Sequence, residues 1–221
     1  MIDLSKVQKR TTADIARRIV QDIPDGAHVN LGIGQPMTIS NYLPSDKEIL
    51  LHSENGLLGM GPLAKDHEID EELVNAGKQP VTMLPGASLC HHADSFVMIR
   101  GGHIDICVLG AFQVSVKGDI ANWRTGDPKA IPAVGGAMDL ALGAKKLFVM
   151  MEHLTKSGES KLVKECTYPL TALAAVDCVY TDLATIAVTP EGLVAVDWVD
   201  GLSFEDLQTL SDVPMIKGSQ R

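Results

Sequence analysis

The sequence has few aromatic residues, few cysteines and no long apolar run. Phe, Trp and Tyr together make up 4% of its 221 residues. The four cysteines, Cys90, Cys107, Cys166 and Cys178, include no C-x-x-C pair, so a zinc ribbon and a thioredoxin motif are excluded. No segment approaches the roughly 20 apolar residues of a membrane-spanning helix, and Met1–Arg18 lacks the apolar core of a signal peptide. We therefore expect a cytoplasmic protein that does not enter a membrane.

Positive charge is also scarce, since 19 Lys and Arg residues stand against 28 Asp and Glu residues, for a net charge of -9. Nine of the acids lie between Glu165 and Ile216, a stretch without Lys or Arg. Removing these nine from the 28 leaves 19 acids to balance the 19 bases. Nucleic acids and anionic membranes attract basic surfaces, so neither is an expected partner. We expect the acidic stretch to face solvent or a protein partner. Substrate should then bind to the rest of the chain, which has no net charge.

What the sequence does contain is an alternation of helical and extended patterns. A helix is predicted over Ser5–Asp22, where Ile15 and Ile19 lie on one face, and a second from Pro36 to Leu43. The pattern predicts strands at residues 28–33, 48–52, 81–84, 104–109 and 146–151, a helix from Met138, a hairpin of residues 185–188 and 193–199, and a last helix capped by Ser203. This order predicts an α/β fold with an open, largely parallel sheet and a small C-terminal hairpin and helix. No linker divides the chain, so we expect a single domain over residues 1–221.

Two signals point to ligands that we do not expect. Gly32-x-Gly34 follows a strand as in a dinucleotide fingerprint, but Met37 occupies the third glycine position, where a bulky residue blocks close packing of helix and strand. A tight strand-to-helix turn is favoured, and a backbone site for another anionic ligand stays open. His91 and His92 are adjacent, and in a strand they would point to opposite faces. We expect no metal site.

The segment from Leu51 to Pro62 carries the strongest functional signal. It places Glu54 at the end of a short apolar strand, and the carboxyl ends of parallel strands are where open α/β sheets build their sites. Asn55-Gly56 permits the turn that lets Glu54 project, and the glycines that follow leave room for a large substrate. A functional carboxylate is therefore predicted; a solvated glutamate beside a turn is the alternative.

The run Leu51–Gly59 resembles the active-site signature of the B subunits of family I coenzyme A transferases. That signature reads Leu/Phe, His/Gln, Ser-Glu-Asn-Gly, two apolar residues and Gly/Ala, and every position fits. The resemblance extends from about Ile15 to Leu210, through segments at residues 30–34, 74–78, 98–105, 118–123, 135–139 and 151–153. It implies the three-layer, largely parallel fold of that family.

The resemblance also implies site residues and a mechanism. Glu54 takes the role of the nucleophile, which attacks an acyl-CoA thioester, forms a mixed anhydride and then holds CoA as a glutamyl thioester. Gly136, preceded by Gly135, is implied as a backbone donor to the oxyanion, and a plain helix-entry turn is the alternative. Asn30 and Lys78 match positions near the CoA moiety. CoA is a substrate, so no cofactor is expected.

A lysine-rich stretch offers charge for the CoA phosphates. Between residues 145 and 164 five lysines stand against two glutamates, a net charge of +3. A solvated basic face is the alternative interpretation.

In this family a separate A-type subunit completes the substrate pockets, and nothing resembling it is present in this chain. We therefore expect a heterotetramer with two copies of each subunit. Segments at residues 105–114, 122–126, 180–183 and 190–193 most resemble family members that use succinyl-CoA as donor and 3-oxoadipate as acceptor. Acetoacetate or another 3-oxoacid stays open as the acceptor. Two further functions stay open: an acyl-CoA hydrolase that uses the same glutamate, and a non-catalytic binding domain.

Overall fold

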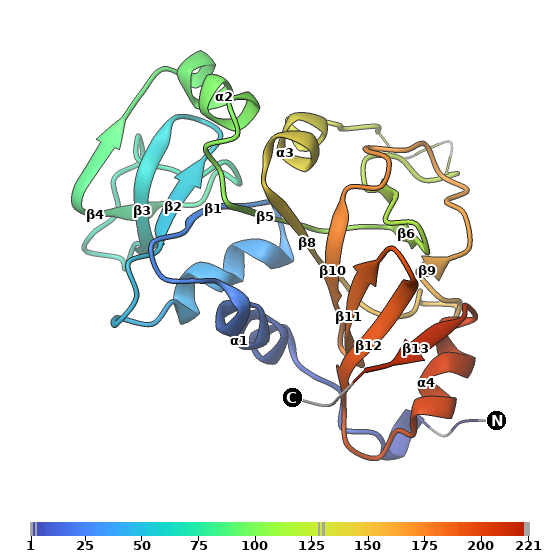
Figure 1. Cartoon of the computed structure of the whole chain (residues 1–221). Coiled ribbons are helices and arrows are strands. Elements are labelled where there is room, and N and C mark those ends of the chain that lie inside the picture. Colours follow the sequence, from blue (N-terminus) through green and yellow to red (C-terminus); the bar gives the residue numbers. More distant parts are fainter. Residues whose placement is uncertain (1, 3, 128, 130, 219–221) are drawn as a thin grey trace. The chain divides into compact units, whose positions relative to one another are not determined.

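The computed structural model describes residues 2, 4–127, 129 and 131–218 (Figure 1). They form two compact units. The Glu54 unit consists of residues 16–110 and 136–147, and the C-terminal unit consists of the described residues of 1–15, 111–135 and 148–221. Because the chain passes from one unit to the other four times, no single cut would release either of them. A single domain over residues 1–221 stays a prediction.

The Glu54 unit contains five strands in the order β5-β1-β2-β3-β4. Their bounds are β1 (His28–Leu31), β2 (Leu50–Ser53), β3 (Leu57–Leu63), β4 (Val81–Leu89) and β5 (Ile106–Leu109). β1 pairs in parallel with β2 and β5, with Val29 opposite both Leu51 and Ile106, whereas β2–β3 and β3–β4 are antiparallel. The parallel strands are buried along most of their length, as apolar strands covered on both faces are. β8 (Lys146–Met150) runs from this unit into the other.

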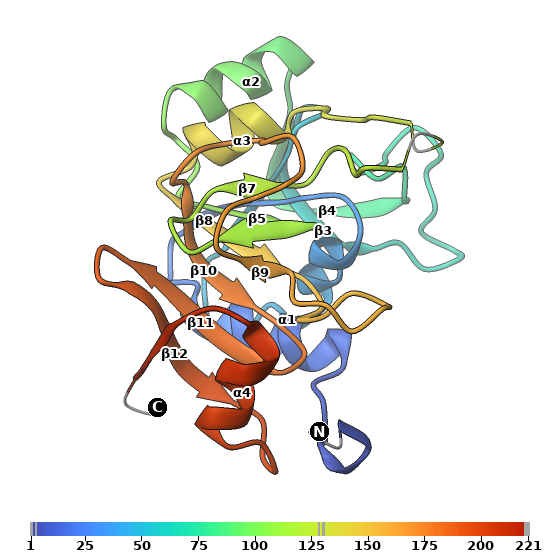
Figure 2. The same cartoon turned by 90° about the vertical axis from the view of Figure 1, so that its right-hand side faces the viewer.

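Four helices belong wholly or largely to the Glu54 unit: α1 (Thr12–Asp22), the 3₁₀ helix η2 (Gln35–Tyr42), α2 (His92–Arg100) and α3 (Ala137–Gly143). Figures 1 and 2 both show α2 lying against α3. A Cβ on Gly143 would collide with the carbonyl oxygen of Ile99, so glycine is what allows this close approach. An ion pair of 2.7 Å between Arg100 Nε and Asp139 Oδ1 joins the two helices.

The first helix is shorter than we predicted. It begins at Thr12 rather than Ser5, and Leu4–Lys6 forms a separate 3₁₀ turn, η1. Thr11 ends the non-helical segment because it caps the helix: Asp14 N donates to Thr11 Oγ1 (3.2 Å), and Thr11 N donates back to Asp14 Oδ2 (3.0 Å). The predicted apolar face is confirmed, since Ile15 and Ile19 are both buried.

The C-terminal unit holds two groups of strands. β6 (Gln113–Ser115) lies between β7 (Ile120–Ala121) and β9 (Leu162–Val163). The second group has the order β13-β12-β11-β10, with β10 (Val176–Tyr180), β11 (Ala184–Thr189), β12 (Gly192–Trp198) and β13 (Met215–Lys217). The predicted hairpin is confirmed, because β11 and β12 are antiparallel and Thr189 lies opposite Gly192. Figure 2 shows this hairpin beside helix α4 (Phe204–Ser211).

The predicted cap of the last helix is also confirmed. Asp206 N donates to Ser203 Oγ (3.0 Å), and Ser203 N donates to the Asp206 carboxylate (3.3 Å), which completes a capping box. The α/β class is confirmed as well. The β5-β1-β2 strands are parallel, whereas β3, β4 and the hairpin strands introduce antiparallel pairs, so the sheets are mixed.

Candidate active site at the β2–β3 hairpin

Glu54 lies in a three-residue turn that connects β2 to β3. Ser53 pairs with Leu57 across the turn, and Gly56 N donates to Ser53 O at 2.9 Å. Gly56 has a φ of +108°, and a Cβ there would collide with the carbonyl oxygen of Cys90, so only glycine fits. Because β2 is parallel to β1, the turn lies at the carboxyl edge of the parallel strands, where the sequence predicted a functional carboxylate.

The carboxylate of Glu54 meets Gly136 and the ring of Phe96. A Cβ built on Gly136 would collide with Glu54 Oε2 and would lie 2.8 Å from Phe96 Cζ. Gly136 has an ordinary φ of -86° at the N-cap of α3, so the lack of a side chain matters here for space rather than for backbone conformation. The structure therefore brings together Glu54 and Gly136, which lie 82 positions apart in the sequence.

Two opposing effects act on the ionisation of Glu54. Partial burial raises the pKa of its carboxyl, and the charge of His92 lowers that pKa by a smaller amount, so the net direction is upward. The His92 ring stacks on Phe96 with a centroid separation of 5.0 Å. A carboxylate with fewer water contacts gives up less solvation when it attacks an electrophile, which favours a nucleophilic role.

A buried hydrogen-bond network lies behind the hairpin. Asn30 Nδ2 is 3.0 Å from His52 Nδ1, and His52 Nε2 is 2.9 Å from Ser95 Oγ. All three residues are at most 2% exposed. Asn30, which we predicted as a contact of CoA, is therefore placed beneath the hairpin, and its direct contact with substrate stays a prediction.

A second turn, formed by residues 74–80, is tied to the Glu54 hairpin. Asn55 Nδ2 donates to Val74 O (2.8 Å), and Ala76 N donates to Ser53 Oγ (3.1 Å). Lys78 is exposed on this turn and has a φ of +62°, a left-handed conformation that a side chain with a Cβ adopts at an energetic cost. Such strain is concentrated at functional positions, and here it holds a cation on the segment attached to the Glu54 turn.

Gly135 differs from its neighbour. It has a φ of +50°, and no atom lies within 4 Å of the position that its Cβ would occupy. Glycine is thus favoured at 135 by backbone conformation and at 136 by the Glu54 carboxylate.

Helix α2 supplies site residues that the sequence did not reveal to us. A strand would point His91 and His92 to opposite faces, but His91 is the N-cap of α2 and accepts a hydrogen bond from Ala93 N at 3.1 Å. Ser95 and Phe96 follow on this helix and were not predicted as site residues. Arg100 in its last turn and the glycines after it were the available signal for a helix.

The glycine turn that resembled a dinucleotide fingerprint has a structural explanation. Gly32 N donates to Val108 O (2.8 Å), and a Cβ on Gly32 would lie 2.8 Å from Leu109 Cδ2, so this glycine permits close packing of the turn against β5. Among the described residues, no group of three or more His, Cys, Asp or Glu side chains is arranged to hold a metal ion. Within the same residues, no helix combines the length and apolarity that a membrane span requires.

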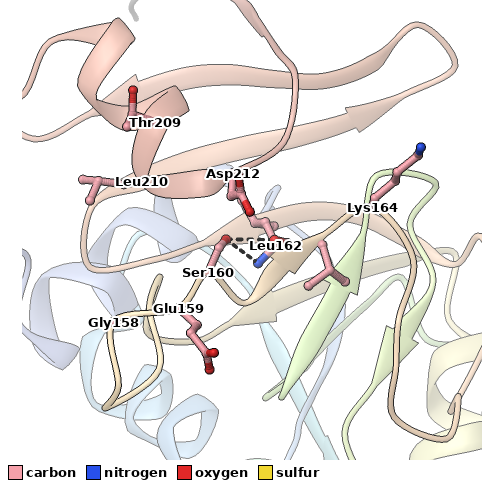
Figure 3. Close-up of a pocket in the computed structure, with 9 residues that line it drawn as sticks. Gly158, Glu159, Ser160, Leu162, Lys164, Thr209, Leu210 and Asp212 are labelled. Atoms are coloured by element: carbon pink, nitrogen blue, oxygen red, sulfur yellow. Dashed lines mark hydrogen bonds between the residues drawn. The ribbon is translucent and has the colours of Figure 1, made fainter.

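The predicted lysine stretch is not a uniform basic face. Lys145 Nζ is 2.7 Å from Asp105 Oδ1 in the Glu54 unit, and Lys161 in the C-terminal unit is half-buried near the charges of Glu152 and Asp182. Lys164 lines an open hollow of about 470 Å³ in the C-terminal unit (Figure 3). The hollow lies between the 158–164 segment and the end of α4, and Glu159 and Asp212 contribute acids to its lining.

Comparison with known proteins gives consistent matches over nearly the whole chain. The family model described as Coenzyme A transferase matches residues 12–200. The B subunit of the 3-oxoadipate CoA-transferase of Pseudomonas putida is 62% identical over 210 residues, which cover 95% of this chain and 98% of that protein. The B subunit of a probable succinyl-CoA:3-ketoacid coenzyme A transferase of Bacillus subtilis is 44% identical over 199 residues, which cover 90% and 92%.

A solved structure shows the same fold. The apoenzyme of an acyl-CoA transferase from Escherichia coli O157:H7 superposes with a TM-score of 0.75 at 17% identity, and the match covers 96% of this chain and 42% of that one. This likeness confirms the predicted fold type.

Proposed function

The chain belongs to the coenzyme A transferase family, and from that membership we propose that it is the B subunit of an enzyme that moves CoA from succinyl-CoA to 3-oxoadipate. Its 62% identity to the B subunit of a 3-oxoadipate CoA-transferase exceeds its 44% identity to that of a succinyl-CoA:3-ketoacid transferase. The names of both relatives agree with a 3-oxoacid as acceptor, and the higher identity favours 3-oxoadipate over acetoacetate.

The observation that carries a catalytic role is the position of Glu54. Its carboxylate touches the point where a Cβ of Gly136 would lie, beside the ring of Phe96, at the carboxyl edge of the parallel strands. A solvated glutamate beside a turn would not need glycine on a separate helix in order to fit. The arrangement supports a nucleophile held against a helix N-terminus.

The proposed reaction moves CoA from a donor acid to an acceptor acid, so that one thioester bond is broken and another is formed. A Glu54 carboxylate oxygen attacks the thioester carbonyl, a C–O bond forms, the C–S bond breaks, and CoA leaves as the thiolate. The thiolate then attacks the Glu54 carbonyl carbon, which forms a glutamyl-CoA thioester and releases the donor acid. The acceptor carboxylate repeats both steps in reverse, and Glu54 is regenerated as a carboxylate. Thioester energy is retained throughout, so ATP is not consumed.

Each attack places negative charge on a carbonyl oxygen, which backbone N–H groups at a helix start are suited to stabilise. We assign this role to Gly136, with Gly135 setting the direction of the chain as it enters α3. Gly135 is part of the substrate pocket in this proposal because its positive φ turns the backbone toward the site.

CoA is a substrate of this reaction, and the proposal includes no cofactor and no metal. Lys78 is assigned to the CoA phosphates, since it is exposed on the turn that Ser53 and Asn55 attach to the hairpin. Asn30 is assigned to the CoA side of the site, where its hydrogen bonds to His52 hold it beneath the hairpin.

A second polypeptide is part of the proposal. Relatives of this chain are named as B subunits, which implies an A-type subunit. We propose two copies of each subunit, in the cytoplasm, where the four free cysteines would stay reduced.

Chemical trapping tests the role of Glu54. The chain, co-expressed with its A-type subunit, is incubated with succinyl-CoA and treated with borohydride, and peptides are mapped by mass spectrometry. We expect the modification on Glu54. Glu54→Gln should fold and assemble but lose about a thousandfold or more in turnover, as loss of a nucleophile does.

The exposed Glu71→Gln serves as the matched control, with the same change of charge in the same unit. Modification of another residue, or turnover retained by Glu54→Gln, would contradict the proposal. The hydrolase alternative predicts that release of CoA is independent of 3-oxoadipate, whereas a transferase requires the acceptor.

A further inference from the structure

The network behind the hairpin has a defined direction. Asn30 Nδ2 lies 3.1 Å from His52 O as well as 3.0 Å from His52 Nδ1. A carbonyl oxygen only accepts, so the amide nitrogen of Asn30 must face His52, and His52 Nδ1 must accept. The proton of the neutral ring is therefore on Nε2, which donates to Ser95 Oγ at 2.9 Å.

The network ends on the backbone of the nucleophile's turn. Ser95 Oγ donates to Ser53 O at 3.4 Å, and Gly56 N donates to the same oxygen at 2.9 Å. Ser53 O belongs to the peptide group that precedes Glu54, so the orientation of that peptide is fixed from α2 as well as from within the turn.

The same serine fixes the position of the aromatic wall. Ser95 precedes Phe96 in α2, and the Phe96 ring contacts the position beside Gly136 that the Glu54 carboxylate also reaches. One hydrogen bond between His52 and Ser95 thus connects the strand that ends at the nucleophile to the helix that desolvates it.

We propose that His52 is a positioning residue for the transfer reaction: through Ser95 it sets the orientation of the Ser53–Glu54 peptide and holds Phe96 against the Glu54 carboxylate. His52 itself is 2% exposed, so it does not reach the substrate. The inference rests on the proposed nucleophilic role of Glu54. Burial lowers the pKa of the ring, which agrees with a neutral His52 that accepts from Asn30.

The role requires one acceptor and one donor at the right separation rather than an imidazole. A glutamine offers both, because Oε1 accepts from Asn30 and Nε2 donates to Ser95. Leucine fills similar space and offers neither group, so the pair of substitutions separates hydrogen bonding from packing.

The test uses the complex with the A-type subunit. His52→Leu and Ser95→Ala should each lower kcat about 10- to 100-fold, the scale expected when reacting groups are displaced. KM for succinyl-CoA should change less than kcat, since the two substituted residues, His52 and Ser95, are buried and do not reach CoA. His52→Gln should restore most of kcat, and the double variant His52→Leu/Ser95→Ala should lose no more than the worse single variant.

The exposed His67→Gln is the control and should behave as the wild type. Single-turnover formation of the CoA adduct, read by mass spectrometry, separates the two ideas. If the wild-type adduct is not on Glu54, the proposed function fails. If it is on Glu54 and the variants His52→Leu and Ser95→Ala both form it at the wild-type rate, the positioning role is overturned. Should His52→Leu fail to assemble, Ser95→Ala, which removes one oxygen atom, decides the question alone.

Discussion

At the residue scale, two adjacent glycines serve different physical purposes. Gly135 needs a positive φ of +50° and has open space around it, whereas Gly136 has an ordinary backbone and no room for a methyl group. The sequence shows only a Gly-Gly pair before a helix. The Glu54 carboxylate that excludes a side chain at 136 comes from a strand end 82 positions earlier, so no local pattern could have separated the two roles.

Gly136→Ala should therefore affect chemistry more than folding. The added methyl collides with Glu54 Oε2 and the Phe96 ring, and a displacement of about 1 Å in a reacting group can cost about 100-fold in rate. We expect kcat to fall by that order while the free energy of unfolding changes by less than about 1 kcal/mol, because alanine is compatible with this φ and ψ. Steady-state kinetics and urea unfolding measure the two quantities.

Gly126→Ala is the matched control for this substitution. Its nearest side-chain neighbour, Tyr168, would lie 3.9 Å from the new Cβ, which is an ordinary contact. A Gly136→Ala enzyme with wild-type kcat would show that the carboxylate does not need its present position.

At the scale of elements, the segment after β8 is anchored to α4 and to the end of β10 by a buried histidine. His153 Nε2 is 2.8 Å from Ser211 Oγ in α4, and His153 Nδ1 is 3.1 Å from Thr181 Oγ1. His153 N donates to Asp182 Oδ1 at 2.7 Å, and Lys9 pairs with the other carboxylate oxygen at 2.9 Å. Burial lowers the pKa of His153 to about 4, against the opposing effect of Asp182.

This histidine makes the stability of the chain depend on pH in a predictable direction. The folded-state pKa lies below the unfolded value of about 6.5, so the stabilisation is complete above about pH 6.5 and is lost as pH falls toward 4. The difference corresponds to about 3 kcal/mol. Between pH 7 and pH 4 the wild type should lose about 3 kcal/mol more unfolding free energy than the variant His153→Gln loses. Urea denaturation at the two pH values measures this difference.

The exposed His67→Gln gives the baseline for that comparison, since it removes a histidine from an exposed position. Parallel pH profiles for His153→Gln and the wild type would contradict the prediction.

Several elements were predictable because their signals are local. The β11–β12 hairpin and the Ser203 capping box follow from residues within a few positions of each other. β3 and α2 were missed for the opposite reason. The glycines of β3 suit close packing against β4, where a Cβ on Gly59 would lie 2.9 Å from Ala87 Cα, and such packing is decided by chain that is remote in the sequence.

At the scale of the whole molecule, the acidic stretch that lacks Lys and Arg lies within one compact unit. All nine acids between Glu165 and Ile216 lie in the C-terminal unit. Six of them are exposed: Glu165, Asp177, Glu191, Asp200, Glu205 and Asp212. Asp182 is the buried exception, and it holds Lys9 and the backbone of His153. A largely solvent-facing acidic stretch agrees with our expectation from the sequence, and contact with a partner stays a prediction.

The enzyme should require its second subunit for activity. The purified chain alone should show no transfer of CoA from succinyl-CoA to 3-oxoadipate, because the A-type subunit completes the substrate pockets in our proposal. Co-expression with that subunit should restore transfer, followed by thioester absorbance, and light scattering should give the mass of two copies of each. Full activity from this chain alone would overturn the requirement.

The sequence by itself determined the α/β class, the family, the position of Glu54 at a strand end and the local caps and turns. These features depend on periodicity and on short motifs, whose residues lie close together in the sequence and interact locally. The tertiary structure alone decided that the Glu54 carboxylate meets Gly136 and Phe96, that His52 is bonded between Asn30 and Ser95, and that Lys78 is strained on an attached turn. These relations join segments that are remote in the chain, and their geometry is set by how strands and helices pack rather than by any one segment.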